Sequence, residues 1–179
     1  MSLLSRQVLK AAFLDRDGVL NYKPEDRYYI DTLDAFALLP EVGEAIGDLS
    51  RAGYLVFITS NQQAVAKGVL SPEDLEKMDR RLRGEAEKQG GRIERSYYCT
   101  HMAGACDCRK PLPGLLLKAF REFPGLTREG SFMVGDAESD AQAAAAAGVA
   151  FHGLKTNGNL RQLLRDKGII EPSLPLKIQ

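Results

Sequence analysis

Short apolar runs alternate with longer amphipathic segments along this chain, and the alternation predicts its fold. Five apolar runs have the length of buried strands: residues 8–14, 54–59, 93–98, 131–134 and 149–154. Five other segments have the length and end signals of helices: residues 41–51, 71–89, 114–123, 139–147 and 159–167. Strands that alternate with helices favour an α/β fold, in which helices cover both faces of a doubly wound parallel sheet.

The length of 179 residues fits a single domain over residues 1–179 that can bury a sizeable core. Residues 171–179 contain two prolines and predict an irregular tail. Lys plus Arg and Asp plus Glu each total 24, so no net field attracts nucleic acid or a membrane surface. There is no apolar run of transmembrane length and no signal peptide over residues 1–10. We expect a cytoplasmic monomer that acts on a small molecule.

Two carboxylates, Asp15 and Asp17, follow the first predicted strand, and Gly18 permits a turn there. In an open α/β sheet, ligands bind outside the carboxyl ends of the strands. Paired carboxylates at such a point suit Mg²⁺, which prefers oxygen ligands and shares them with water or substrate phosphate. Taken alone, the pair could equally be a solvated acidic turn, since Asp and Gly are ordinary turn residues.

Three further polar clusters follow strands or precede a helix, and all could meet the aspartates in one crevice. They are Ser60-Asn61-Gln62, Arg109-Lys110 and the segment 135–140 with Asp136 and Asp140. Phosphoryl transfer needs such a set, because its catalysis is mostly positioning and electrostatic stabilisation. A carboxylate can attack phosphorus, a second acid can protonate the leaving oxygen, and a cation can bring two anions together.

In order and spacing, Asp15-Arg16-Asp17-Gly18, Ser60, Lys110 and Asp136 with Asp140 resemble the four motifs of the haloacid dehalogenase superfamily of phosphatases. The resemblance implies a Rossmann-like fold and a set of roles. Asp15 would be the nucleophile, Asp17 the general acid/base, Ser60 a ligand of the phosphoryl group and Lys110 its electrostatic partner. Mg²⁺ would be held by Asp15, the backbone carbonyl of Asp17 and Asp136, with Asp140 as support.

Many members of that superfamily carry a cap domain between motifs, and the intervals here are too short for one. The crevice should therefore be open, with specificity supplied by loops. Residues 21–34 are either such a loop or a packed surface segment. Arg109 could bind a second phosphate bidentately or pair with a surface acid. Asn61 and Gln62 could bind sugar hydroxyls or cap the next helix, and His152 is expected to be structural.

Three cysteines and a histidine lie within ten residues: Cys99, His101, Cys106 and Cys108. Zn²⁺ favours a closed tetrahedral set of sulfur and nitrogen ligands, so this loop, residues 99–108, predicts a structural zinc site. Three buried thiols or a redox pair of Cys106 and Cys108 are the alternatives, and the pair would leave Cys99 and His101 unexplained. A zinc-bound loop directly before Arg109 and Lys110 would help to fix the position of the lysine.

The joined pattern of this loop with Arg109-Lys110-Pro111 is similar to the D-glycero-D-manno-heptose 1,7-bisphosphate phosphatases and the related histidinol-phosphate phosphatases. The similarity implies removal of the 7-phosphate in nucleotide-activated heptose biosynthesis, with Mg²⁺ and Zn²⁺ as cofactors. Histidinol phosphate is the rival substrate, and a non-catalytic, zinc-stapled binding module is the rival from another class. The chain departs from the heptose enzymes at Gln63-Ala64, where Ser-Gly is common, at Ala137, where a basic residue is common, and in its short Cys loop.

Overall fold

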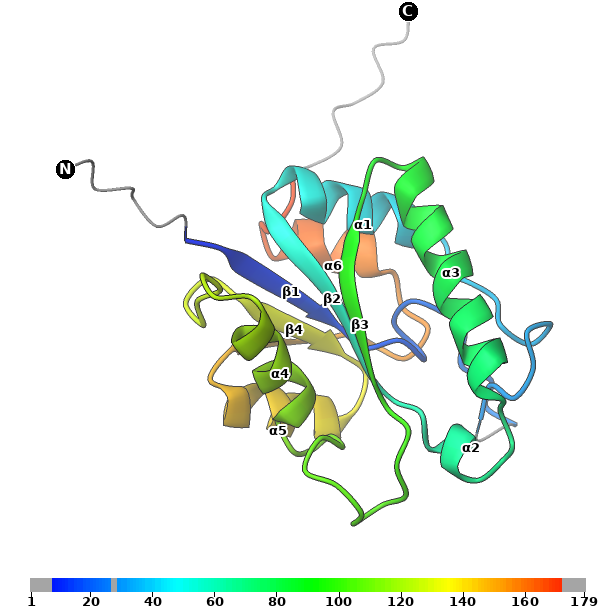
Figure 1. The fold of residues 1–179 in the computed structure, drawn as a ribbon. Helices are drawn as coiled ribbons and strands as arrows, with labels where there is room; N and C mark the ends of the chain where they lie inside the picture. The colour runs from blue at the N-terminus through cyan, green and yellow to red at the C-terminus, as the bar shows by residue number, and fades with distance from the viewer. Residues whose placement is uncertain (1–7, 27–28, 172–179) are drawn as a thin grey trace, which may run out of the picture.

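A five-stranded parallel sheet forms the centre of the molecule in a computed structural model, which describes residues 8–26 and 29–171 (Figure 1). The strands are β1 (Lys10–Leu14), β2 (Tyr54–Asn61), β3 (Ile93–Cys99), β4 (Phe132–Gly135) and β5 (Ala150–Gly153), in the order β3-β2-β1-β4-β5. The helices are α1 (Val42–Arg51), α2 (Gln63–Ala66), α3 (Pro72–Lys88), α4 (Gly114–Glu122), α5 (Glu138–Ala147) and α6 (Leu160–Asp166). The predicted α/β fold is confirmed.

Helices cover both faces of the sheet. Helices α1, α3 and α6 lie on one face, and α4 and α5 lie on the other (Figure 1). The central strand shows why: Ala12 and Leu14 belong to the first core, whereas Ala11 and Phe13 belong to the second. Burying one Leu or Phe side chain stabilises the fold by about 1.5–3 kcal/mol, so a strand that is apolar on both faces holds both helical layers in place.

The strand order creates a switch point beside β1. The chain passes from β1 outward to β2 and β3, and then returns to place β4 on the other side of β1. Loops that leave β1 and β4 therefore diverge, and a crevice opens at the carboxyl end of β1, which is where ligands bind in sheets of this kind. Asp15 is the first residue after β1, so the fold itself places it at this crevice.

The structure differs from the expected elements at several points; for example, β1 begins at Lys10 instead of residue 8, and Val8 is exposed. Strand β2 continues through Ser60 and Asn61, which pair with Tyr98 and Cys99 of β3, so these polar residues end the strand rather than follow it. Helix α2 is not predicted, because four residues are too few to show a helical period. Most of the expected tail, residues 172–179, lies outside the described residues.

The segments between the polar clusters contain no cap domain within the described part of the chain. The first interval holds a loop and α1, and the second holds α2, α3, β3 and the Cys loop. No helix of the described residues is both long and apolar enough to cross a membrane.

Candidate active site and metal-binding loop

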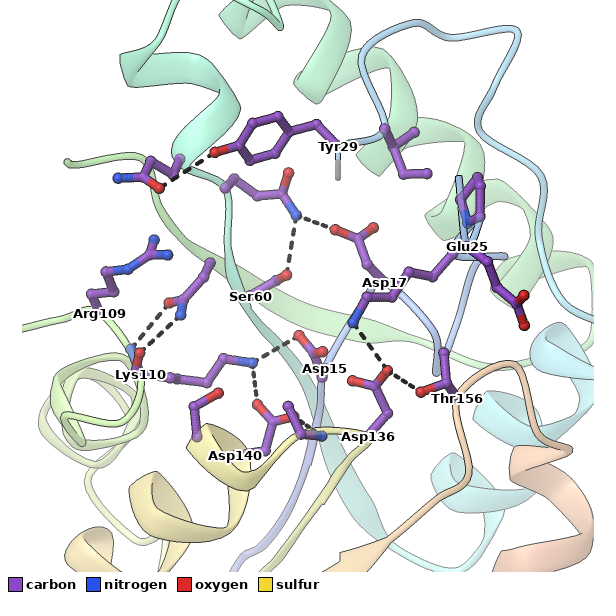
Figure 2. A pocket seen from close by; sticks show the side chains of 18 residues that line it. Asp15, Asp17, Glu25, Tyr29, Ser60, Arg109, Lys110, Asp136, Asp140 and Thr156 are labelled. Carbon is purple, nitrogen blue, oxygen red and sulfur yellow. Dashed lines mark hydrogen bonds and ion pairs between the residues drawn. The ribbon is translucent and has the colours of Figure 1, made fainter. Parts of the chain in front are cut away.

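A pocket of about 560 Å³ opens at the carboxyl edge of the sheet (Figure 2). Its lining brings together all four polar clusters and two further segments. The lining includes Asp15, Asp17, Lys23, Glu25, Tyr29, Ser60, Asn61, Gln62, Gln63, Arg109, Lys110, Asp136, Asp140 and Thr156. The expected convergence of the clusters on one crevice is therefore present in the structure.

Lys110 is a buried lysine in the lining of the pocket. Its Nζ is 2.7 Å from Asp15 Oδ1 and 2.6 Å from Asp140 Oδ1, and it donates to the carbonyl oxygen of Thr59 at 2.8 Å. Only 4% of the residue is exposed. Burial would lower the pKa of the ammonium, but the two carboxylates raise it, so Lys110 stays charged.

Burial affects Asp15 in the opposite way to its lysine partner. It raises the pKa of the Asp15 carboxyl to about 6; Lys110 opposes this rise and Asp140 adds to it. A second cation near Asp15 would favour the carboxylate that a nucleophile needs.

The Asp17 side chain is held by a network that contains a completely buried arginine. Arg16 Nε donates to Asp17 Oδ1 at 2.9 Å, and Gln62 Nε2 donates to Asp17 Oδ2 at 2.9 Å and to Ser60 Oγ at 3.1 Å. Arg16 Nη2 in turn donates to Gln62 Oε1 at 3.1 Å. Burial works to raise the pKa of Asp17, but Arg16 and these hydrogen bonds hold it below its usual value.

The amide side chains that follow Ser60 have separate tasks. Asn61 binds the backbone of Lys110 in both directions: its Nδ2 donates to the Lys110 carbonyl, and its Oδ1 accepts from the Lys110 amide, both at 3.0 Å. Gln62 is the N-cap residue of α2, but its side chain makes no capping hydrogen bond. Both amide side chains thus hydrogen-bond to candidate catalytic residues, and these contacts were not predicted from the sequence.

Arg109 lines the pocket next to Lys110. Its Nη1 is buried, and no hydrogen-bond acceptor among the described residues reaches it. A buried guanidinium nitrogen without an acceptor is costly, and an anionic group of a ligand would satisfy it. The side chain points toward the pocket in Figure 2.

Three carboxylates, Asp15, Asp136 and Asp140, have oxygens within 4.8 Å of one another. Asp136 Oδ1 is buried, and no donor from the described residues reaches it. Asp140 is already engaged, because it pairs with Lys110 and also accepts from the Ala137 amide at 3.1 Å, at the start of α5. An oxygen-rich set with one unpartnered buried oxygen fits a hard cation such as Mg²⁺.

Gly18 brings the β1 loop close to this cluster. Its φ is +89°, and a Cβ at this position would lie 2.5 Å from Asp136 Oδ2. Only glycine accepts both the positive φ and the close approach.

Residues 21–34 combine the two properties expected of them as alternatives. Lys23, Glu25 and Tyr29 line the pocket, and Ile30, which also lines it, is 3% exposed and belongs to the core. Tyr29 OH lies 3.5 Å from Gln63 Oε1. The described part of this segment therefore both borders the pocket and packs against the core. Arg27 and Tyr28 are outside the described residues.

Two pocket residues that contact Asp136 were not predicted individually, although Lys23 lies in the expected loop 21–34. Lys23 Nζ is 3.2 Å from Asp136 Oδ2, and Thr156 Oγ1 donates to the same oxygen at 2.8 Å (Figure 2). Thr156 follows β5, so its position at a strand end was the available signal. His152, expected to be structural, is half-buried within β5 against Phe132 and does not line the pocket.

The Cys loop gathers its four candidate ligands. The sulfur of Cys106 lies 3.5 Å from that of Cys99 and 3.4 Å from that of Cys108, and Cys108 lies 3.4 Å from His101 Nδ1. These sulfurs are too far apart for disulfides, whose S–S bond is about 2.05 Å. Zn–S bonds of about 2.3 Å in a tetrahedron place sulfurs about 3.8 Å apart, so the four ligands fit one zinc ion.

The loop is tied closely to the helix that follows Lys110. A Cβ on Gly114, the first residue of α4, would lie 2.5 Å from the carbonyl oxygen of Asp107 and 2.6 Å from Cys108 Cα. The loop backbone therefore rests directly on the start of α4. Arg109 and Lys110 lie between these two points, so both ends of their segment are anchored.

Fold and pocket together define a doubly wound α/β protein with a carboxylate centre suited to phosphoryl transfer. The family of haloacid dehalogenase-like hydrolases matches residues 4–148. The chain belongs to this family, as its four motifs predict.

Several named phosphatases are similar to this protein over most of its length. The D-glycero-beta-D-manno-heptose-1,7-bisphosphate 7-phosphatase of Pseudomonas putida is 40% identical over 167 residues, which is 93% of each chain. The D-glycero-alpha-D-manno-heptose-1,7-bisphosphate 7-phosphatase of Campylobacter jejuni is 39% identical over 134 residues, 75% of each chain. The crystal structure of the D,D-heptose 1,7-bisphosphate phosphatase from B. bronchiseptica, complexed with magnesium and phosphate, is 31% identical with a TM-score of 0.76. The match covers 94% of this chain and 89% of that one.

Proposed function

We propose that this protein is a Mg²⁺-dependent phosphomonoesterase that removes the 7-phosphate of D-glycero-D-manno-heptose 1,7-bisphosphate through an aspartyl-phosphate on Asp15. The observation that carries the chemistry is the buried contact of 2.7 Å between Lys110 Nζ and Asp15 Oδ1, beside two further carboxylates. The names and high coverage of the relatives support the substrate.

The reaction assigns two successive steps to the two aspartates. In the first, an Asp15 oxygen attacks phosphorus, the bond to the sugar oxygen breaks, and Asp17 gives that oxygen a proton. In the second, Asp17 takes a proton from water, and the resulting hydroxide attacks phosphorus and breaks the bond to Asp15. The products are inorganic phosphate and the dephosphorylated sugar, and both aspartates return to their starting states.

Asp17 must carry a proton in the first step, although its pKa is low in the free protein. An incoming phosphate brings negative charge close to the carboxylate, and a nearby like charge favours the protonated form. Gln62 keeps Asp17 beside Ser60 by donating to both side chains, at 2.9 and 3.1 Å. Ser60 would donate its hydroxyl hydrogen to a phosphoryl oxygen, and Lys110 would balance the charge that develops there.

Asp15, the backbone carbonyl of Asp17 and Asp136 would hold Mg²⁺, with Asp140 supporting Lys110 rather than the metal. When bound, Mg²⁺ would lower the repulsion between the Asp15 carboxylate and the anionic phosphate. Cys99, His101, Cys106 and Cys108 would hold Zn²⁺ as a structural ion, because four protein ligands leave no open position for chemistry.

A second phosphate on the substrate would explain Arg109. Its buried, unpartnered Nη1 suits an anion, whereas histidinol phosphate has no second phosphate and instead carries an ammonium group and an imidazole. Glu25, which also lines the pocket, is the residue that favours this rival, since a carboxylate could bind the amine.

Phosphate release from the two heptose 1,7-bisphosphate anomers and from histidinol phosphate, each with Mg²⁺, tests the proposal. We expect turnover of one or both anomers and at least about tenfold lower kcat/KM on histidinol phosphate, a loss of about 1.4 kcal/mol of transition-state binding. Arg109→Ala should raise KM for the bisphosphate, and Glu25→Ala is the matched control at the same pocket. Faster turnover of histidinol phosphate would contradict the substrate, and full activity of Asp15→Asn would contradict the nucleophile.

A further inference from the structure

The two carboxylate oxygens of Asp136 have different surroundings. Oδ2 accepts from Thr156 Oγ1 at 2.8 Å and lies 3.2 Å from Lys23 Nζ. Oδ1 is buried, and none of the donors in the described residues reaches it. A side-chain carboxylate can rotate about its last torsion and exchange its oxygens, because that torsion is broad. The two donors therefore select which oxygen faces the other carboxylates (Figure 2).

Both donors are held by one loop, residues 154–159 between β5 and α6. The Leu154 amide donates to the Gly135 carbonyl at 2.9 Å, next to Asp136, and the Asn157 amide donates to the Gly18 carbonyl at 2.8 Å. The Asn157 side chain also binds the Lys23 backbone, accepting from its amide at 2.8 Å and donating to its carbonyl at 2.9 Å. The loop thus fixes Thr156 and the Lys23 backbone relative to Asp136.

We propose that Thr156 is a positioning residue for the metal site: its hydroxyl holds Oδ2 of Asp136 so that Oδ1 is presented to Mg²⁺. This inference rests on the proposed metal role of Asp136. The hydroxyl orients the carboxylate without carrying charge. The Lys23 ammonium also attracts Oδ2, but it repels a divalent cation, and its side chain is 44% exposed. Thr156 is therefore the donor whose loss should weaken metal binding.

The test measures metal binding directly, with Mn²⁺ as a paramagnetic probe of the oxygen site in zinc-loaded protein. Removing a group that orients a metal ligand costs about 10–100-fold in affinity. Because Lys23 remains in place, we expect the dissociation constant for Mn²⁺ to rise about tenfold in Thr156→Val, at the lower end of that range. Thr156→Ser keeps the hydroxyl and should stay within about threefold of the unmodified protein.

Two further variants make the result specific. Thr127→Val removes a hydroxyl that donates to the Glu129 carbonyl, near the start of β1 and away from the pocket, and should leave Mn²⁺ binding unchanged. Asp136→Asn should abolish binding. In steady-state assays, the Mg²⁺ concentration for half-maximal activity of Thr156→Val should rise with the dissociation constant, while kcat at saturating Mg²⁺ stays within about twofold.

Unchanged Mn²⁺ affinity in Thr156→Val would overturn the inference, and so would an equal loss in Thr156→Ser, since the hydroxyl would then not be responsible. Persistent binding in Asp136→Asn would instead refute the proposed metal role of Asp136. Thermal unfolding of each variant identifies any that fail to fold, and in that case Thr156→Ala replaces Thr156→Val.

Discussion

Asp15→Asn should make the metal-free protein more stable while it abolishes turnover. Burial raises the pKa of the Asp15 carboxyl from 3.8 to about 6, despite the nearby Lys110. Each pKa unit corresponds to about 1.36 kcal/mol, so at neutral pH the charged side chain costs the folded state at most about 3 kcal/mol. Asparagine removes the charge and keeps an acceptor for Lys110, which also retains Asp140 and the Thr59 carbonyl.

The sign of the pH dependence follows from the raised pKa. Between about pH 4 and 6 the folded protein binds more protons at Asp15 than the unfolded chain does, so rising pH removes stability over this window. Asp15→Asn has no carboxyl group at this position and does not lose this stability as the pH rises. A gain of about 2 kcal/mol at pH 7 would raise the unfolding temperature by about 4–8 °C in a protein of this size. The gain should shrink toward zero near pH 4.

Thermal unfolding followed by circular dichroism, in buffer without Mg²⁺ and without chelator, measures this gain from pH 4.5 to 7.5. Asp48→Asn is the matched control. Burial acts to raise the pKa of Asp48, but hydrogen bonds from Arg161 and Arg51 lower it overall, so its charge stabilises the fold above the unfolded pKa. That variant should lose up to about 1 kcal/mol at pH 7. The reasoning would be refuted if Asp15→Asn unfolded at or below the unfolding temperature of the unmodified protein. It would also be refuted if the gain in unfolding temperature did not change with pH.

Three further changes test separate parts of the site. Asn61→Ala removes both hydrogen bonds to the Lys110 backbone; kcat should fall about tenfold with a smaller change in KM, and an unchanged kcat in steady-state assays would contradict this role. Cys106→Ser removes one of the four candidate zinc ligands. If they hold zinc, elemental analysis should find one zinc per chain in the unmodified protein and a large loss in the variant; equal zinc contents would refute the site. Arg16→Met leaves the Asp17 carboxylate without its cationic partner and should cost about 3 kcal/mol in urea unfolding, whereas an unchanged urea midpoint would show that Arg16 does not stabilise the fold.

The strands and the convergence of the polar clusters could be predicted because they depend on local pattern. Strand β1, which contains Phe13, has apolar side chains on both of its faces. Asp15, Ser60 and Asp136 each lie at or beside a strand end. A parallel sheet then brings strand ends to one edge without further information. The family motifs added roles for these residues.

The missed contacts have partners that no local pattern marks. Asn61 binds backbone atoms 49 residues away, and backbone groups have no signature in a sequence. Thr156 and Lys23 are single polar residues in loops, and their common partner is Asp136. Such contacts depend on how two loops meet, which hydrophobic periodicity does not determine.

The double hydrogen bond from Asn61 to Lys110 has a consequence for how this protein could change. Lys110 is hydrogen-bonded through its backbone to the end of β2, and Cys99, the last residue of β3, begins the Cys loop. Residues 102–105 lie between the candidate ligands His101 and Cys106, and insertions there need not move the lysine. The loop can vary in length while the chemistry is conserved, so the segment between its candidate zinc ligands offers a place where new substrate preferences can evolve or be grafted.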